Sequence, residues 1–254
     1  GIPGEAADAI SAQIPGAHLP NDLVTALVEK SLIQIEPTLD EAEIIRFRML
    51  ETIRQFAIDE LDRTGEMTSA RIAQAKAMAM LVDGAESGLT GPDQHAWYRN
   101  LERNHDNIAV ALESSIASGE VGPGLAIGAR LYRFWANRGY IREASDWYAR
   151  LLPLPGEDPS KDRGDCWLGA GVMAYFRGEL EGAEASTRNA QHQFMAIGHE
   201  LGVAYSYGNL GMIADAGGDP SAATSLYTHA LSMFRRLGDE TSEGYMLGNL
   251  GLVL

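Results

Sequence analysis

Apolar residues recur every three to four positions along most of this chain, which is the period of an amphipathic helix. Two clear examples are residues 165–177 and 181–197. Gly178 follows the first and Gly198 follows the second, and glycine readily adopts the left-handed conformation that closes a helix. The pattern therefore predicts a mainly all-α fold built from helical hairpins.

The helical pattern repeats with a period of 40 residues. The segment LGAGVMA from Leu168 aligns with GNLGMIA from Gly208 and with GNLGLVL from Gly248. The same register holds for the pairs Gly178 and Gly218, Ala183 and Ala223, Ala190 and Ala230, Phe194 and Phe234, and Gly198 and Gly238. We expect small pairs, Gly171 with Ala183 and Gly211 with Ala223, to let two helices approach closely. We expect the two phenylalanines to fill the space toward the next hairpin.

This order of Gly, Gly, Ala and Ala resembles the tetratricopeptide repeat, whose usual period is about 34 residues. The resemblance implies a right-handed superhelix with a concave face. Residues 121–254 are predicted as the repeat domain, with a degenerate unit at 125–152, units at 165–198 and 200–238, and a truncated unit at 240–254. Helices over Ser69–Ala85 and Gln94–Ala117 predict a helical linker or bundle at 66–120.

The first 65 residues have a different pattern. The predicted elements are a helix over Asp22–Lys30, a strand over Ser31–Glu36, a polar tip over Pro37–Glu43, a strand over Ile44–Leu50 and a helix over Glu51–Arg63. Helix, strand, tip and strand form the second half of a winged helix. Its early helix is either Ala6–Ile14 or sequence outside this chain. Residues 1–65 are therefore predicted to be the C-terminal part of a winged-helix domain.

Five segments resemble one bacterial family: LVEKSL at 27–32, RFRMLETIRQFA at 46–57, GLTGPDQ at 88–94, ERNHDNI at 102–108 and FWANRGY at 134–140. The family is that of the NB-ARC-like signal-transduction ATPases, which include LuxR-type and AfsR-like transcriptional regulators. The resemblance implies an ATPase domain before the winged helix, tetratricopeptide-like repeats after it, and a DNA-binding helix-turn-helix at one end.

The chain departs from that family in its chemistry. It has no Gly-x-x-x-x-Gly-Lys-[Ser/Thr] loop to cradle phosphates, so nucleotide hydrolysis is not carried over and ATP or ADP is expected only in a separate ATPase domain. It also has no His-Glu-x-x-His and no Gly-x-Ser-x-Gly motif. We expect no enzyme activity, no cofactor and no metal here. Because the N-terminus lacks an initiator Met and the C-terminus stops inside an apolar pattern, we expect a piece of a longer protein.

The charge and composition of the chain limit the kinds of partner that we expect it to bind. The chain has 20 basic and 35 acidic residues, a net charge of −15, and this field repels phosphate backbones. We expect no direct contact with nucleic acid. The lone cysteine, Cys166, is expected to be a small buried hydrophobe and is consistent with a reducing, cytoplasmic setting. No apolar run approaches the roughly 18 residues of a membrane span.

The concave face is the candidate site. If the first helix of each unit lines it, the side chains that point there are Arg130, Arg133, Asn137, Tyr175, Tyr205, Asn209, Asp215, Tyr245 and Asn249. Asparagine can hydrogen-bond a peptide backbone, and arginine can bind a carboxylate. The alternative is structural: tyrosines that pack between helices and asparagines that support interhelical contacts.

The sequence therefore predicts a non-catalytic sensor or protein-interaction segment of a multidomain ATPase that regulates transcription. Its expected partners are a protein or small-molecule effector and the ATPase domain of its own protein. The alternatives are a free-standing tetratricopeptide-type adaptor and a self-assembly scaffold. The last would form a homo-oligomer through the apolar face around Leu247, Leu250 and Leu254.

Overall fold

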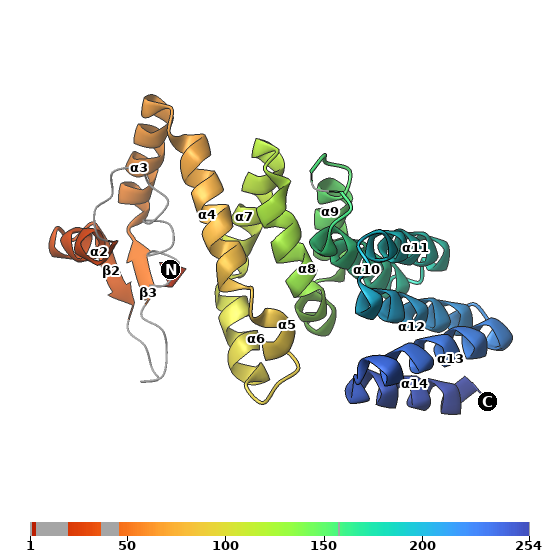
Figure 1. The fold of residues 1–254 in the computed structure, drawn as a ribbon. Coiled ribbons are helices and arrows are strands. Elements are labelled where there is room, and N and C mark those ends of the chain that lie inside the picture. The colour runs from red at the N-terminus through yellow and green to blue at the C-terminus, as the bar shows by residue number, and fades with distance from the viewer. Residues whose placement is uncertain (1, 4–19, 37–45, 157, 254) are drawn as a thin grey trace. The chain divides into compact units, whose positions relative to one another are not determined.

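The computed structural model describes residues 2–3, 20–36, 46–156 and 158–253 (Figure 1). The predicted tip Pro37–Glu43 and the predicted early helix Ala6–Ile14 lie outside these residues. The chain divides into two compact units, residues 1–127 and 128–254, and each is described by itself.

The first unit begins with a small antiparallel sheet in the order β1-β3-β2. The elements are β1 (Ile2–Pro3), α2 (Pro20–Glu29), β2 (Ile33–Glu36) and β3 (Arg46–Met49). In the register of β2 with β3, Ile35 faces Phe47 and Glu36 faces Arg46. The two strands predicted from sequence are thus confirmed, with shorter bounds.

Helices complete the first unit: α3 (Glu51–Thr64), α4 (Met67–Leu81), α5 (Ala85–Gly88), α6 (Gln94–Arg103) and α7 (His105–Ser118). Buried residues of α4 and α7, among them Ala75 and Leu112, form its core. The prediction of one helix over Gln94–Ala117 is wrong, because the backbone turns at Asn104. The helix predicted over Ser69–Ala85 likewise ends at Leu81.

The second unit is a succession of antiparallel helices (Figure 1). The division between the units falls within α8 (Val121–Arg138), and the helices that follow are α9 (Ile141–Leu151), α10 (Lys161–Phe176), α11 (Leu180–Ala196), α12 (Glu200–Ala216), α13 (Pro220–Leu237) and α14 (Glu240–Val253). Gly178, Gly198, Gly218 and Gly238 occupy the turns with φ of 77°, 69°, 79° and 75°. These left-handed glycines recur at the spacing that the sequence predicted.

Small residues bring the paired helices together. A Cβ on Gly171 would lie 2.5 Å from Thr187 Oγ1 and 3.1 Å from the Ala183 carbonyl, which confirms the expected close approach of α10 and α11. On α12 the arrangement differs, because a Cβ on Gly211 would meet the Tyr227 ring at 2.6 Å. An aromatic ring, rather than Ala223, sets the spacing there.

Aromatic side chains fill the space between hairpins. Phe194 is fully buried, and its ring would clash with a Cβ at either Gly164 or Gly202. It therefore packs on its own hairpin and on the next one, as the sequence predicted. Phe234 is 1% exposed and lies in the cluster of α12, α13 and α14.

A buried arginine fixes the loop before α10. Arg163 is 4% exposed, and its guanidinium donates to the carbonyls of Leu152 at 2.8 Å and Leu154 at 3.0 Å. Ser160 caps α10 by accepting from the Arg163 N–H. This cap fixes the start of α10 at Lys161.

Candidate functional site

One side of α12 stays partly open although most of that helix is enclosed. Tyr205, Asn209 and Met212 are half-buried, and their spacing of four and three residues places them on one face of the helix. Forty residues later, α14 carries Tyr245, Asn249 and Leu252 in the same register. We call these six residues the first-helix surface.

Tyr205 also holds two hairpins together. Its hydroxyl donates to Asp239 Oδ2 at 3.1 Å, and its ring centroid lies 5.2 Å from that of Phe234. Burial raises the pKa of Tyr205. Burial also acts to raise the pKa of Asp239, but hydrogen bonds from Ser242 and Tyr205 outweigh it and leave that pKa lowered. The tyrosine therefore packs between helices, which is the structural alternative left open by the sequence.

The two asparagines are placed differently. Asn209 and Asn249 are half-buried, and within the described part of the chain their amides have no hydrogen-bond partner. Tyr245 nearby is 67% exposed. A half-buried amide offers two N–H donors and a carbonyl acceptor, so this surface can pair with the backbone of a bound peptide.

Tyr175 and Asp215 lie near a third group, Tyr227. Burial raises the pKa of Tyr227 to about 12, and the nearby Asp215 and Tyr175 add to the effect. Asp215 is exposed and Tyr175 is half-buried, with its ring centroid 5.8 Å from that of Phe176. Both predicted residues therefore act electrostatically on the hydroxyl of Tyr227.

The three predicted residues of α8 separate. Arg130 Nη1 pairs with Asp162 Oδ1 at 2.7 Å, which ties α8 to α10. The Arg133 guanidinium lies 5.2 Å from the Tyr132 ring centroid and is close enough to act on the Tyr205 hydroxyl. Asn137 is exposed near the end of α8. Of the three, Arg133 is the residue that acts electrostatically on Tyr205.

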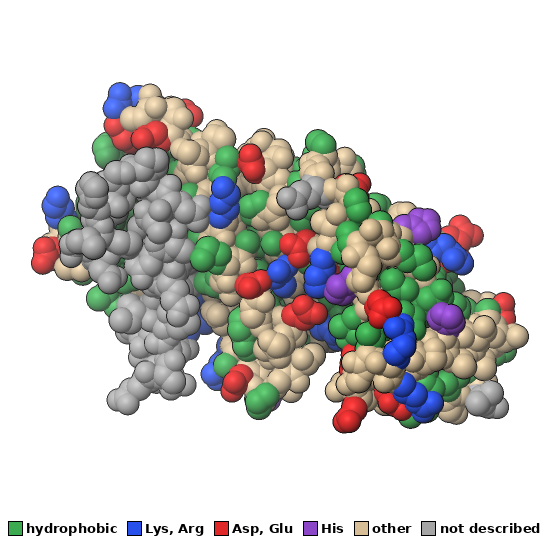
Figure 2. All heavy atoms as spheres, viewed as in Figure 1, with side chains coloured by type: hydrophobic (Ala, Val, Ile, Leu, Met, Phe, Trp, Pro, Cys, Tyr) green, Lys and Arg blue, Asp and Glu red, His purple; other side chains and the backbone are tan. Residues whose placement is uncertain are grey.

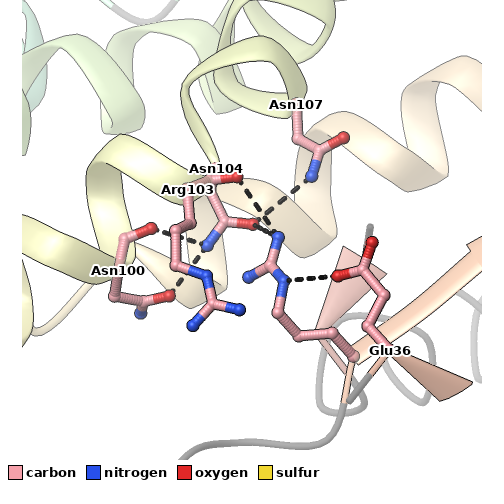
Figure 3. A network of polar contacts seen from close by, with 6 residues as sticks. Glu36, Asn100, Arg103, Asn104 and Asn107 are labelled. Carbon is pink, nitrogen blue, oxygen red and sulfur yellow. Dashed lines mark hydrogen bonds and ion pairs between the residues drawn. The ribbon is translucent and has the colours of Figure 1, made fainter. Parts of the chain in front are cut away.

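A buried polar network in the first unit was missed by the sequence reasoning (Figure 3). Arg46 of β3 is 5% exposed and Asn104 is fully buried. Arg46 Nη2 donates to the Arg103 carbonyl at 3.2 Å and to Asn104 Oδ1 at 3.3 Å, while its Nε lies 3.6 Å from Glu36 Oε2. Asn104 Nδ2 in turn donates to Asn100 O and Oδ1 at 2.9 and 2.8 Å.

This Arg46–Asn104 network joins the sheet to the corner between α6 and α7. A buried guanidinium is costly unless it is paired and hydrogen-bonded, so the carbonyl, amide and carboxylate partners fix the strand on the corner. Both sides come from segments of the family resemblance, RFRM and ERNHDNI. The available sequence signal was an arginine among the apolar residues of the predicted strand Ile44–Leu50.

Two of the other resemblance segments, GLTGPDQ and FWANRGY, contribute packing contacts. In GLTGPDQ, a Cβ on Gly88 would lie 2.1 Å from Trp97 Nε1, so only glycine fits beside that indole. In FWANRGY, the Phe134 and Tyr140 ring centroids lie 5.7 Å apart, and Phe134 is fully buried. Cys166 is also fully buried, as predicted, and burial raises its thiol pKa.

Side chains of both charges are scattered over the region of α12 to α14 (Figure 2). Arg236 pairs with Glu200 at 2.9 Å and Arg235 with Glu243 at 2.7 Å, so part of the acidic excess is locally compensated.

Within the described ranges, no helix is both long and apolar enough to cross a membrane.

The fold is a mainly helical, tetratricopeptide-like arrangement that follows a small sheet. It is similar to the crystal structure of BtubC (BKLC) from P. vanneervenii, with a TM-score of 0.50, 19% identity, and coverage of 79% of this chain and 76% of that chain. At this identity the likeness concerns the fold alone.

In sequence, the chain is similar to candidate HTH-type transcriptional regulators of Mycobacterium tuberculosis and Mycobacterium bovis. The identity is 27% over 134 residues, which is 52% of this chain. The matched stretch is 14% of the length of those relatives, so the similarity is to one part of large proteins. No family model matches the chain.

Proposed function

We propose that this chain is a non-catalytic partner-binding segment of a large regulator of transcription, of the signal-transduction ATPase type. A peptide segment of a protein effector binds at the first-helix surface. Nucleotide binding belongs to another domain of such a regulator. The distant similarity to large transcriptional regulators and the order of sheet, bundle and repeats support this proposal.

One observation supports the proposed peptide binding most directly. Asn209 and Asn249 stand 40 residues apart in register, both half-buried and without hydrogen-bond partners within the described part of the chain. A bound peptide backbone supplies a donor and an acceptor at regular spacing. Tyr245, largely exposed on the same helix as Asn249, adds apolar contact area.

The Arg46–Asn104 network gives the segment a second task. It fixes the sheet of the first unit to the α6–α7 corner through buried polar contacts.

A random-peptide phage library panned on the purified chain tests the binding step. Selected peptides are titrated by calorimetry against the chain and against an Asn209→Ala, Asn249→Ala double variant. Losing two hydrogen bonds of about 1 kcal/mol each predicts a roughly 30-fold weaker affinity. The control, Asn189→Ala, removes an exposed amide from α11 and should bind normally. Equal affinities for the double variant and the unaltered chain refute the proposal.

A further inference from the structure

The start of α12 is held by a histidine side chain. His199 Nδ1 accepts the backbone N–H of Gly202 at 3.0 Å, and this hydrogen bond caps the helix. A ring nitrogen accepts a hydrogen bond only while it carries no proton. The neutral ring therefore carries its proton on Nε2, and protonation of Nδ1 turns the acceptor into a donor that faces another donor.

The next two helices of the repeats are capped by carboxylates. At the start of α13, Asp219 Oδ1 accepts the Ala222 N–H at 2.9 Å. At the start of α14, Asp239 Oδ1 accepts the Ser242 N–H at 3.0 Å. A carboxylate keeps its acceptor oxygens between about pH 5 and 8, whereas an imidazole takes up a proton within that interval. Of these three helices, α12 alone depends on a cap that a proton can remove at such pH values.

His199 also joins two successive hairpins. Its backbone N–H donates to the Phe194 carbonyl at 2.8 Å, which closes α11 after Gly198 in the left-handed conformation. Its ring centroid lies 5.3 Å from that of Phe194. The Phe194 ring in turn would clash with a Cβ at Gly164 of α10 or at Gly202 of α12. A change at this imidazole therefore affects the junction of α10, α11 and α12.

The elements around the imidazole carry charges that are already paired. Glu200 follows it on α12 and pairs with Arg236 of α13 at 2.9 Å. From α11 the imidazole meets the ring of Phe194, and α10, which also contacts that ring, carries Lys161 and Asp165 as a pair at 2.7 Å. Both carboxylates thus have a cationic partner, and a charged imidazole would meet the positive end of the α12 dipole.

We propose that His199 is a pH-sensitive switch at the start of α12. Above about pH 7 the neutral ring caps the helix. As the pH falls toward about 5.5, the ring takes up a proton, the hydrogen bond from Gly202 is lost and the first turn of α12 opens. The residues that open directly precede Tyr205, so the switch lies at the edge of the first-helix surface. The proposal rests on the cap and does not depend on peptide binding.

Hydrogen exchange followed by NMR on the whole chain tests this switch. The protection factor of the Gly202 amide, which is corrected for the intrinsic exchange rate, is compared at about pH 7.5 and about pH 5.5. Loss of a cap worth about 1 kcal/mol predicts a roughly fivefold fall in the unaltered chain, at about 1.4 kcal/mol per factor of ten. Long-range nitrogen–proton spectra of the His199 ring are expected to show Nδ1 unprotonated at the higher pH.

Variants separate the proton on this ring from other effects of pH. In His199→Asn the amide oxygen accepts the same N–H at every pH, so the protection of Gly202 should not fall. In His199→Ala no cap forms, so the protection should be low and equal at both pH values. The control, His192→Asn, replaces an exposed histidine of α11 and should keep the fall seen in the unaltered chain.

Thermal melts followed by circular dichroism verify that each variant is folded at both pH values. Equal protection of Gly202 at the two pH values in the unaltered chain overturns the proposal, as does an equal fall in His199→Asn. A neutral ring with its proton on Nδ1 would also overturn it, because that nitrogen could not then accept the N–H. No peptide is present in these measurements, so their outcome is independent of the peptide-binding proposal.

Discussion

Adding a single carbon at Gly211 tests how closely α12 and α13 are packed. In Gly211→Ala the new Cβ would lie 2.6 Å from Cδ1 and Cε1 of Tyr227 and 3.2 Å from Cγ. Favourable carbon contacts lie near 3.5–4.0 Å, so the ring must move by about 1 Å. Tyr227 is only 2% exposed, and a ring enclosed on all sides moves only by displacing its neighbours.

Two effects then oppose each other. Alanine is favoured over glycine in a helix interior by about 1 kcal/mol, whereas an extra carbon in a packed core costs about 1–3 kcal/mol. We expect a net loss of about 1 kcal/mol for Gly211→Ala. Gly251→Ala on α14 meets nothing within 4 Å, so only the gain remains, at about 0.5–1 kcal/mol near a helix end.

Urea unfolding followed by circular dichroism measures both variants against the unaltered chain. The pair should differ by about 2 kcal/mol, which corresponds to about 4–8 °C in Tm for a chain of this size. The m-value should stay constant, because neither variant changes the surface exposed on unfolding. If Gly211→Ala proved as stable as Gly251→Ala, the contact with Tyr227 would not set the helix spacing.

Three further predictions concern buried groups. Asn104→Ala removes an acceptor from the buried Arg46 and should cost about 2–4 kcal/mol in urea unfolding. The control is Glu51→Gln, which breaks the exposed ion pair of Glu51 with Arg54 and should leave the unfolding curve unchanged. Because burial raises the thiol pKa of Cys166, a disulfide reagent should modify it only as the chain unfolds; fast labelling of the native chain would contradict this. The pKa of Tyr227 is raised to about 12, above the roughly 10 of an unfolded tyrosine. Its contribution to stability is therefore complete below about pH 10 and is lost between about pH 10 and 12, and Tyr227→Phe should show a shallower decline over that interval.

The spacing of residues in the sequence predicted which helix faces form the candidate site, but not the contacts between its helices. The 40-residue repeat placed Asn209 and Asn249 on corresponding faces of two different helices, because equivalent positions of a repeat occupy equivalent places in its helix. The hydroxyl contact of Tyr205 with Asp239 joins residues 34 positions apart. The ion pair of Arg130 with Asp162 spans 32 positions. Periodicity carries no information about such pairs, because they depend on how separate helices stack.

The sequence by itself determined the helical hairpins, since apolar period and left-handed glycines such as Gly178 and Gly218 act within a few residues of the chain. It did not predict the turn at Asn104. The helical pattern of the sequence continues through this position. In the structure α6 ends there, because the Asn104 side chain donates to the Asn100 carbonyl and accepts a hydrogen bond from Arg46, which lies 58 positions earlier in β3. Only the tertiary structure decided that corner, because a buried guanidinium must find its acceptors wherever the fold supplies them.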